Sequence, residues 1–190
     1  MRAAGLLLLV LSGCATSSSF AFRPTETANL TPENQAVARY VVPRALPRGE
    51  LFATSEGVVP TTASGKEGPA LLVRITVFNV TSHAPWAVDV RDQIVSLPGG
   101  IQVHASDVKT TAPGAPILAI TPGERVTMDL YFALPENQRT PNEIAGFDFI
   151  WQVNTDDKRA AGMVPFARVD LGAPAPATAP VATVASSAPF

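Results

Sequence analysis

Apolar and polar residues alternate along much of the chain from residue 70 onward. In the clearest run, every second residue from Val126 to Leu134 is apolar, and Thr127, Asp129 and Tyr131 lie between them. A period of two is typical of a half-buried β-strand, because successive side chains point to opposite faces of a sheet. Comparable patterns predict further strands at 73–78, 86–91, 93–97, 101–103, 117–120, 147–153 and 164–169.

Turn signals separate these segments. Pro98-Gly99-Gly100 predicts a hairpin turn, and Thr121-Pro122-Gly123-Glu124 has proline and glycine where a type II turn prefers them. The chain lacks a convincing long helix, and parallel neighbours in a sheet need helical crossovers. Seven or so short strands joined by turns therefore predict an all-β, antiparallel β-sandwich over residues 38–172.

The composition agrees with many strands and few solvated helices. Charged residues make up 16% of the chain, against roughly 25% in an average soluble domain. The formal net charge is −2 and no basic block stands out, so nucleic acid is not an expected partner. A single cysteine excludes a disulfide within the chain, and the fold must therefore rely on its packed core.

The first fourteen residues have the order of a bacterial export signal. Arg2 gives a short positive region, and the apolar run at 6–11 is too short to span a bilayer by itself. Leu11-Ser12-Gly13-Cys14 then resembles the lipobox of bacterial lipoproteins. By this resemblance, residues 1–13 are a signal peptide, and Cys14 is acylated and becomes the mature N-terminus.

This resemblance implies a location. Two or three acyl chains on Cys14, at about 0.8 kcal/mol per buried methylene, anchor a protein stably to a membrane. Ala15 in place of aspartate favours the outer membrane over retention at the inner one. We therefore expect a lipid-anchored protein of the bacterial cell envelope, at the outer membrane. The alternative is an ordinary cleaved signal with an incidental cysteine.

Two tails are expected on either side of the sandwich. Residues 14–37 are predicted to be the lipidated N-terminus and a tether, with 15–29 as a flexible coil. Thr31-Pro32-Glu33 has the composition of a helix start, but the stretch 38–42 fits a first strand equally well. Residues 173–190 are rich in alanine and proline and are predicted to be disordered.

A second resemblance concerns the body of the chain. The segments LLVRITVFNVTSHAP, ITPGERVTMDLYFALP and FDFIWQV resemble immunoglobulin-like domains of uncharacterised bacterial envelope lipoproteins. The likeness spans roughly residues 70–155, and the cysteine pair of true immunoglobulin domains is missing. It implies an immunoglobulin-like sandwich and carries no implication for activity.

The residues that commonly perform catalysis form no recognisable motif. His83 and His104 are the only histidines and have no cysteine or second histidine at ligand spacing, so no metal or cofactor is expected. Asp89 and Asp92 point to opposite faces of a strand and are not expected to share a proton. The charged run at 156–159 is interpreted as a solvated hairpin tip, and no Gly-x-Ser-x-Gly motif occurs.

Three apolar side chains on the predicted outer faces are the candidates for binding: Phe78, Tyr131 and Ile150. They either lie partly covered or form a partner-binding patch. The main hypothesis is a non-enzymatic module that binds an envelope protein, with its oligomeric state left open. The alternative is an envelope hydrolase, or a carrier of a small ligand or metal, with a site that assembles only in three dimensions, such as His104 beside Ser106.

Overall fold

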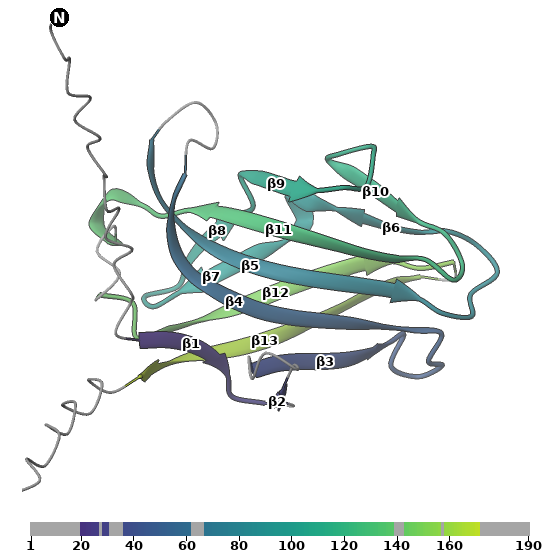
Figure 1. Cartoon of the computed structure of the whole chain (residues 1–190), viewed down its shortest axis with the longest axis horizontal. Coiled ribbons are helices and arrows are strands. Elements are labelled where there is room, and N and C mark those ends of the chain that lie inside the picture. Colours follow the sequence, from purple (N-terminus) through teal and green to yellow (C-terminus); the bar gives the residue numbers. More distant parts are fainter. Residues whose placement is uncertain are drawn as a thin grey trace, which may run out of the picture.

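Two antiparallel sheets pack face to face in the computed structural model of this protein, as Figure 1 shows. The structure describes residues 20–26, 28–30, 36–61, 67–138, 143–156 and 158–171. Within these ranges there are thirteen strands and two 3-10 helices, η2 (Val90–Asp92) and η3 (Glu136–Gln138). The predicted all-β antiparallel sandwich is confirmed. No helix in the described ranges has the length and apolar character needed to cross a membrane.

One sheet, called the β12 sheet here, has seven strands. Its main order is β1-β13-β12-β6-β10, and β7 pairs with both β12 and β8. The bounds are β1 (Phe20–Pro24), β6 (Trp86–Asp89), β7 (Ile94–Leu97), β8 (Ile101–His104), β10 (Ile117–Ile120), β12 (Gly146–Asn154) and β13 (Arg159–Asp170).

The second sheet, called the β5 sheet, has six strands in the order β2-β3-β4-β5-β11-β9. The bounds are β2 (Ala28–Leu30), β3 (Ala36–Val42), β4 (Gly49–Thr61), β5 (Gly68–Asn79), β9 (Asp107–Thr110) and β11 (Arg125–Ala133). β4 and β5 form a long hairpin whose register shifts between Ser55 and Gly57, so Glu56 is an extra residue on β4. Such a bulge bends a strand and increases its twist.

The core lies between the two sheets and contains the predicted inner faces together with residues of β1, β3 and β4. The largest fully buried side chains are apolar with one exception, the amide of Gln93. Alternate positions of β5, β11 and β12 supply a large part of the core: Val73, Ile75, Val77, Val126, Met128, Leu130, Phe132, Phe147, Phe149, Trp151 and Val153. Alternation along β5, β11 and β12 thus identified correctly which of these side chains are buried.

Both predicted turns are present. Gly99 and Gly100 join β7 to β8 with φ angles of +84° and +79°, which glycine adopts without steric cost. Gly123 has a φ of +82°, and the Glu124 N–H donates to the Thr121 carbonyl at 2.9 Å. This is the geometry of the type II turn that the sequence predicts between β10 and β11.

The predicted tether is wrong for residues 20–24 and 28–30, which form β1 and β2. β1 pairs with β13 from Phe20 opposite Asp170 to Pro24 opposite Phe166. Phe20 and Phe22 are buried, and this burial offsets the entropy of ordering a short polar-flanked segment. Among the described residues, the sandwich therefore begins at Phe20 rather than at residue 38.

The open alternative for 38–42 is decided in favour of a strand, because β3 spans Ala36–Val42 and pairs with β4. Residues 90–92, predicted partly as strand, instead form η2. The predicted signal peptide, Cys14, the helix start at 31–33 and the tail at 173–190 lie outside the described residues.

Candidate functional site

The three candidate binding residues lie on two opposite faces of the molecule. Phe78 on β5 and Tyr131 on β11 lie on the outer face of the β5 sheet, because their neighbours Val77 and Phe132 point into the core. Ile150 lies on the outer face of the β12 sheet. The three side chains therefore do not form one patch.

Phe78 is partly covered by a neighbouring cation. The Arg125 guanidinium lies 4.7 Å from the centre of the Phe78 ring and 5.9 Å from that of Phe52. The Arg39 guanidinium lies 6.0 Å from the centre of the Phe52 ring and forms an ion pair with Glu50. Cation–π contacts of this kind stabilise exposed aromatic rings and reduce their availability to a partner.

Polar side chains on the outer face of the β5 sheet bond to one another across the central strands β5 and β11. Arg74 on β5 donates to both carboxylate oxygens of Asp129 on β11 at 2.7 and 3.1 Å, and it lies 3.2 Å from Glu56. The hydrogen bond to Asp129 raises the pKa of Arg74. The Thr76 and Thr127 hydroxyls lie 2.8 Å apart. The polar side chains of this face therefore have their partners largely on neighbouring strands of the same sheet.

Ile150 belongs to an apolar row on the opposite face. It pairs with Met163 of β13 on one side and with Ile94 of β7 on the other. Met163 is 51% exposed, whereas Ile150 and Ile94 are half-buried. A row of three apolar side chains across neighbouring strands is small for an exposed patch, and Ile150 alone does not define a binding surface.

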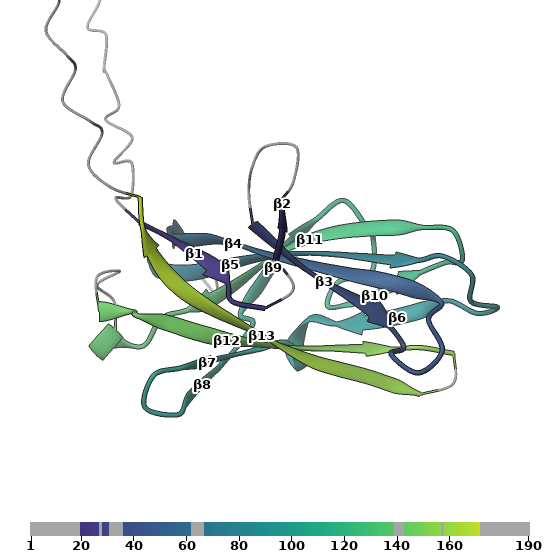
Figure 2. The same ribbon diagram turned by 90° about the horizontal axis from the view of Figure 1, so that it is seen from below.

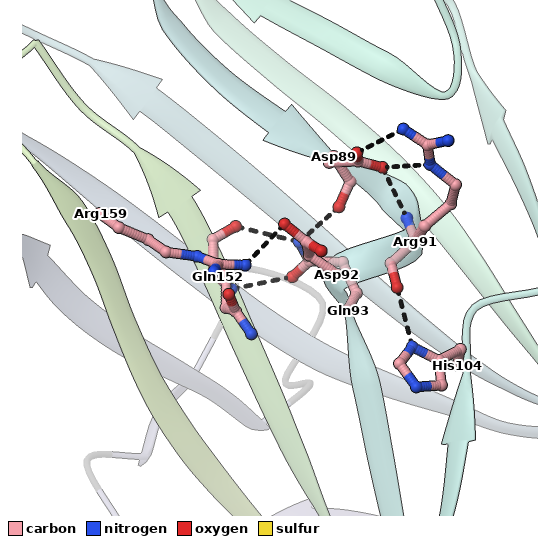
Figure 3. A network of polar contacts seen from close by, with 7 residues as sticks. All are labelled: Asp89, Arg91, Asp92, Gln93, His104, Gln152 and Arg159. Carbon is pink, nitrogen blue, oxygen red and sulfur yellow. Dashed lines mark hydrogen bonds and ion pairs between the residues drawn. The ribbon is translucent and has the colours of Figure 1, made fainter.

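Figure 3 shows a polar network around η2 that includes both carboxylates considered as candidates. The Asp89 carboxylate accepts hydrogen bonds from the Arg91 backbone N–H at 3.0 Å and from its guanidinium at 2.9 and 2.7 Å. These bonds lower the pKa of Asp89. Asp92 instead contacts Arg159 at 2.7 Å. Each carboxylate is thus bound to its own arginine, which does not favour proton exchange between them.

Gln93 connects this network to the core. Its side-chain amide donates to the carbonyls of Asp89 and Gln152 at 2.8 and 3.0 Å and accepts from the Gln152 N–H at 3.1 Å. β12 pairs with β7 at Ile150 and with β6 at Asn154, so Gln152 lies between the two partners. The Gln93 amide therefore bonds to the Gln152 backbone groups where neither β6 nor β7 pairs with them. Its role is structural.

The residues of the alternative hydrolase hypothesis each make separate local bonds. His104 Nδ1 lies 2.9 Å from the Arg91 carbonyl, and the Ser106 hydroxyl donates to the Tyr131 carbonyl at 3.0 Å. The Asp107 carboxylate accepts from the Val108 N–H at 2.8 Å. In the part of the chain that the structure describes, no cluster of three or more histidine, cysteine or acidic side chains could hold a metal ion.

A groove of about 1060 Å³ lies where the two sheets diverge, between β3 and β13. Trp151 and Tyr40 line it, with their ring centres 5.6 Å apart, and the Tyr40 hydroxyl donates across the groove to the Met163 carbonyl at 2.9 Å. Gly162 lies against the Trp151 indole, and a Cβ at this position would approach ring atoms to 2.5 Å. The glycine therefore permits the close packing of β13 on the indole.

The lining of this groove is predominantly cationic. Among the described residues, four basic side chains and one acidic side chain line it: Arg39, Arg44, Lys158, Arg159 and Glu26. Arg39 and Arg159 are already paired with Glu50 and Asp92. No ion pair joins Arg44 or Lys158 to another residue of the described ranges.

Sequence reasoning did not find the groove. It interpreted Lys158 and Arg159 as a solvated hairpin tip, and the alternation within the predicted strand at 147–153 put Trp151 on the same face as Phe149 and Val153. Trp151 is 4% exposed, which agrees with its assignment to the buried face of the strand. The groove forms between β3 and β13, which are more than one hundred residues apart, and no local pattern signals that proximity.

No protein-family model matches the chain, and neither a curated protein nor a solved structure matches it. Its function is therefore inferred from its residues and their geometry.

Proposed function

We propose that this protein is a bacterial lipoprotein of the cell envelope, whose β-sandwich acts as a non-enzymatic binding or assembly module. The observation that carries the proposal is the order of the first fourteen residues: Arg2, the apolar run at 6–11, and Leu11-Ser12-Gly13-Cys14. A thiol is the side chain that forms a thioether with a diacylglyceryl group, and the small residue before it gives a peptidase access. Ala15 favours the outer membrane as the destination.

The start of β1 supports a position close to the membrane. Residues 15–19 separate Cys14 from Phe20, the first residue of β1. Six residue steps span at most about 20 Å when fully extended. A sandwich linked so closely to an acylated cysteine stays within reach of other envelope components, which is suited to a binding module with a partner in the same compartment.

The experiment compares the wild-type protein with a Cys14→Ser variant in a bacterial host. The wild-type protein is expected in the membrane fraction, with a mass that includes acyl chains on a mature N-terminal cysteine. Cys14→Ser is expected to lose the acyl mass and the processing at residue 14, so that residues 1–13 stay attached. The physical reason is that a hydroxyl cannot replace the thiol in the thioether bond.

A matched control moves the cysteine without removing it. A Cys14→Ser/Ser17→Cys variant has the same composition, but its cysteine follows Ala15-Thr16 and no longer follows Leu11-Ser12-Gly13. It is expected to behave like Cys14→Ser. The proposal fails if Cys14→Ser carries the same acyl mass as the wild type, or if the purified wild-type protein retains residues 1–13 and carries no acyl chain.

A further inference from the structure

The first half of β13 has an open edge. β1 pairs with β13 only from Phe166 to Asp170, whereas β12 pairs with it from Arg159 to Ala167 on the other side. No described strand pairs with residues 159–165 on the β1 side. Next to the end of this pairing, the Thr25 N–H donates a hydrogen bond to the Pro165 carbonyl at 2.9 Å.

Two observed bonds show which backbone groups of β13 face this edge. The Pro165 carbonyl accepts from Thr25 and the Met163 carbonyl accepts from the Tyr40 hydroxyl, both from the side away from β12. Backbone groups alternate between the two sides of an antiparallel strand. The N–H and carbonyl of Ala161 and the N–H of Met163 therefore also point toward the open edge.

β3 has an open edge on the other side of the groove. β2 pairs with β3 only over Ala36–Ala38, and no strand in the described ranges pairs with residues 39–42 on that side. Figure 2 shows β3 and β13 running along the same side of the molecule. The groove between them is lined by residues of both strands. Open strand edges of this kind are templates for pairing with another chain.

The charges beside the edge define the partner. Lys158 immediately precedes β13, and Arg44 lies in the β3–β4 connection on the opposite wall. Both cations lack an ion-pair partner among the described residues. Carboxylates on a bound segment would complement these two cations.

We infer that the edge of β13 in this groove binds an extended, acidic peptide segment of a partner protein. The peptide adds as a strand beyond residues 159–165, with main-chain hydrogen bonds to Ala161 and Met163. Its carboxylates face Arg44 and Lys158. At Met163, the incoming N–H replaces the Tyr40 hydroxyl as the donor to the carbonyl. The inference rests on the proposed binding role and is independent of the acyl anchor.

The test uses the full-length protein in detergent and two synthetic peptides of equal length, one alternating glutamate with valine and one alternating lysine with valine. Hydrogen exchange is measured for the amides of Ala161 and Met163. The glutamate peptide is expected to slow both by roughly tenfold or more, which corresponds to about 1.4 kcal/mol of local protection. The lysine peptide is expected to leave both unchanged.

Two variants at one position separate main-chain pairing from side-chain contact. Met163→Pro removes an N–H that points away from β12, and Pro165 already occupies an equivalent position in the strand. It is expected to weaken binding of the glutamate peptide at least tenfold, whereas Met163→Ala is expected to retain most of the affinity. Thermal melting establishes that each variant is folded.

A third variant, Lys158→Glu, reverses one of the two charges that face the peptide and lies outside the strands of the sheet. It is expected to reduce affinity for the glutamate peptide severalfold and to keep the melting temperature. The inference is overturned if neither peptide slows exchange, if both peptides bind equally, or if self-association of the protein protects Ala161. Each of these results would leave the acyl mass and processing of Cys14→Ser unchanged, so failure of the two proposals can be distinguished.

Discussion

Gln93 shows how a single polar side chain can be an integral part of an apolar core. It is fully buried, and its amide bonds to the backbone of Asp89 and Gln152 where β12 changes partner from β6 to β7. Buried polar groups are tolerated when their hydrogen bonds are complete. The residue lies in an apolar stretch of sequence that reads as an ordinary strand, so its role was not predictable from the pattern.

We predict that Gln93→Met destabilises the protein by about 2–3 kcal/mol, because a side chain of similar size leaves buried backbone groups without partners. The measurement is the free energy of unfolding in urea. Gln102→Met, on the exposed face of β8, is the control and is expected to change stability by less than about 0.5 kcal/mol. Equal effects in the two variants would contradict the structural role of the amide.

The Glu124 carboxylate stabilises the β10–β11 turn in a pH-dependent manner. It accepts hydrogen bonds from the backbone N–H and the hydroxyl of Thr121, both at 2.9 Å, and these bonds lower its pKa. A lowered pKa in the folded state gives stability that is present above the unfolded pKa and is lost as the pH falls through the folded pKa. The affected window therefore lies below about pH 4.3.

The wild-type protein is accordingly expected to melt at a higher temperature than Glu124→Gln at pH 7, and this difference is expected to shrink as the pH is lowered to about 3. Thermal unfolding of both proteins across this range is the measurement. Glu143→Gln, at another exposed acidic residue, serves as the control. A difference that stays constant down to pH 3 would show that the ionised carboxylate does not stabilise the turn.

At the scale of elements, β1 shows how a short segment joins a sheet through its aromatic side chains. Phe22 lies 5.5 Å from Phe20 and 5.3 Å from Phe147 in edge-to-face contacts, and Phe147 stacks on Phe166 at 4.9 Å. Arg168 lies 3.9 Å from the Phe20 ring centre. The five residues of β1 follow a run of serines and contain too few alternations to predict a strand. The aromatic residues that pack against them belong to β12 and β13, which are distant in the sequence.

If β1 is an integral strand, Phe22→Ala should cost about 3–4 kcal/mol of unfolding free energy, because it leaves a cavity in this aromatic cluster. Arg23→Ala, at the next position on the solvent face, is expected to cost less than about 0.5 kcal/mol. Urea unfolding of both variants is the test. A small loss in Phe22→Ala would mean that the segment is dispensable, as expected for a tether.

The whole molecule has its two described ends side by side. Phe20 at the start of β1 is opposite Asp170 at the end of β13, while Arg159 at the start of β13 is at the other end of the strand. Twelve residues of strand extend about 35 Å. An anchor at Cys14 would therefore hold the Phe20 end toward the membrane and direct the groove at residues 159–163 away from it.

This orientation predicts different membrane proximities for two labelled positions. A fluorophore on Val169→Cys, which is 38% exposed near the Phe20 end, is expected to be quenched strongly by lipids with spin-labelled headgroups. The same fluorophore on Lys158→Cys, beyond the other end of β13, is expected to be quenched weakly. Both are measured on the acylated protein in vesicles. Equal quenching would contradict the orientation.

The sequence by itself determined the strands with clear alternation, the two glycine turns and the part of the core that those strands supply. These features are local, because a period of two and a positive φ at glycine depend on neighbouring residues. β4 escaped prediction because its bulge between Ser55 and Gly57 interrupts the alternation. The leader and Cys14 were likewise read from local order, and they remain a prediction.

Only the tertiary structure decided which faces and edges come together. Alternation assigns Phe78 and Ile150 to the outer side of their own strands, but it does not reveal that these sides belong to opposite sheets. The groove depends on β3 and β13 lying side by side and on where β1 and β2 stop pairing with them. Such long-range pairings are set by the packing of the whole core, and no short segment of the chain encodes them.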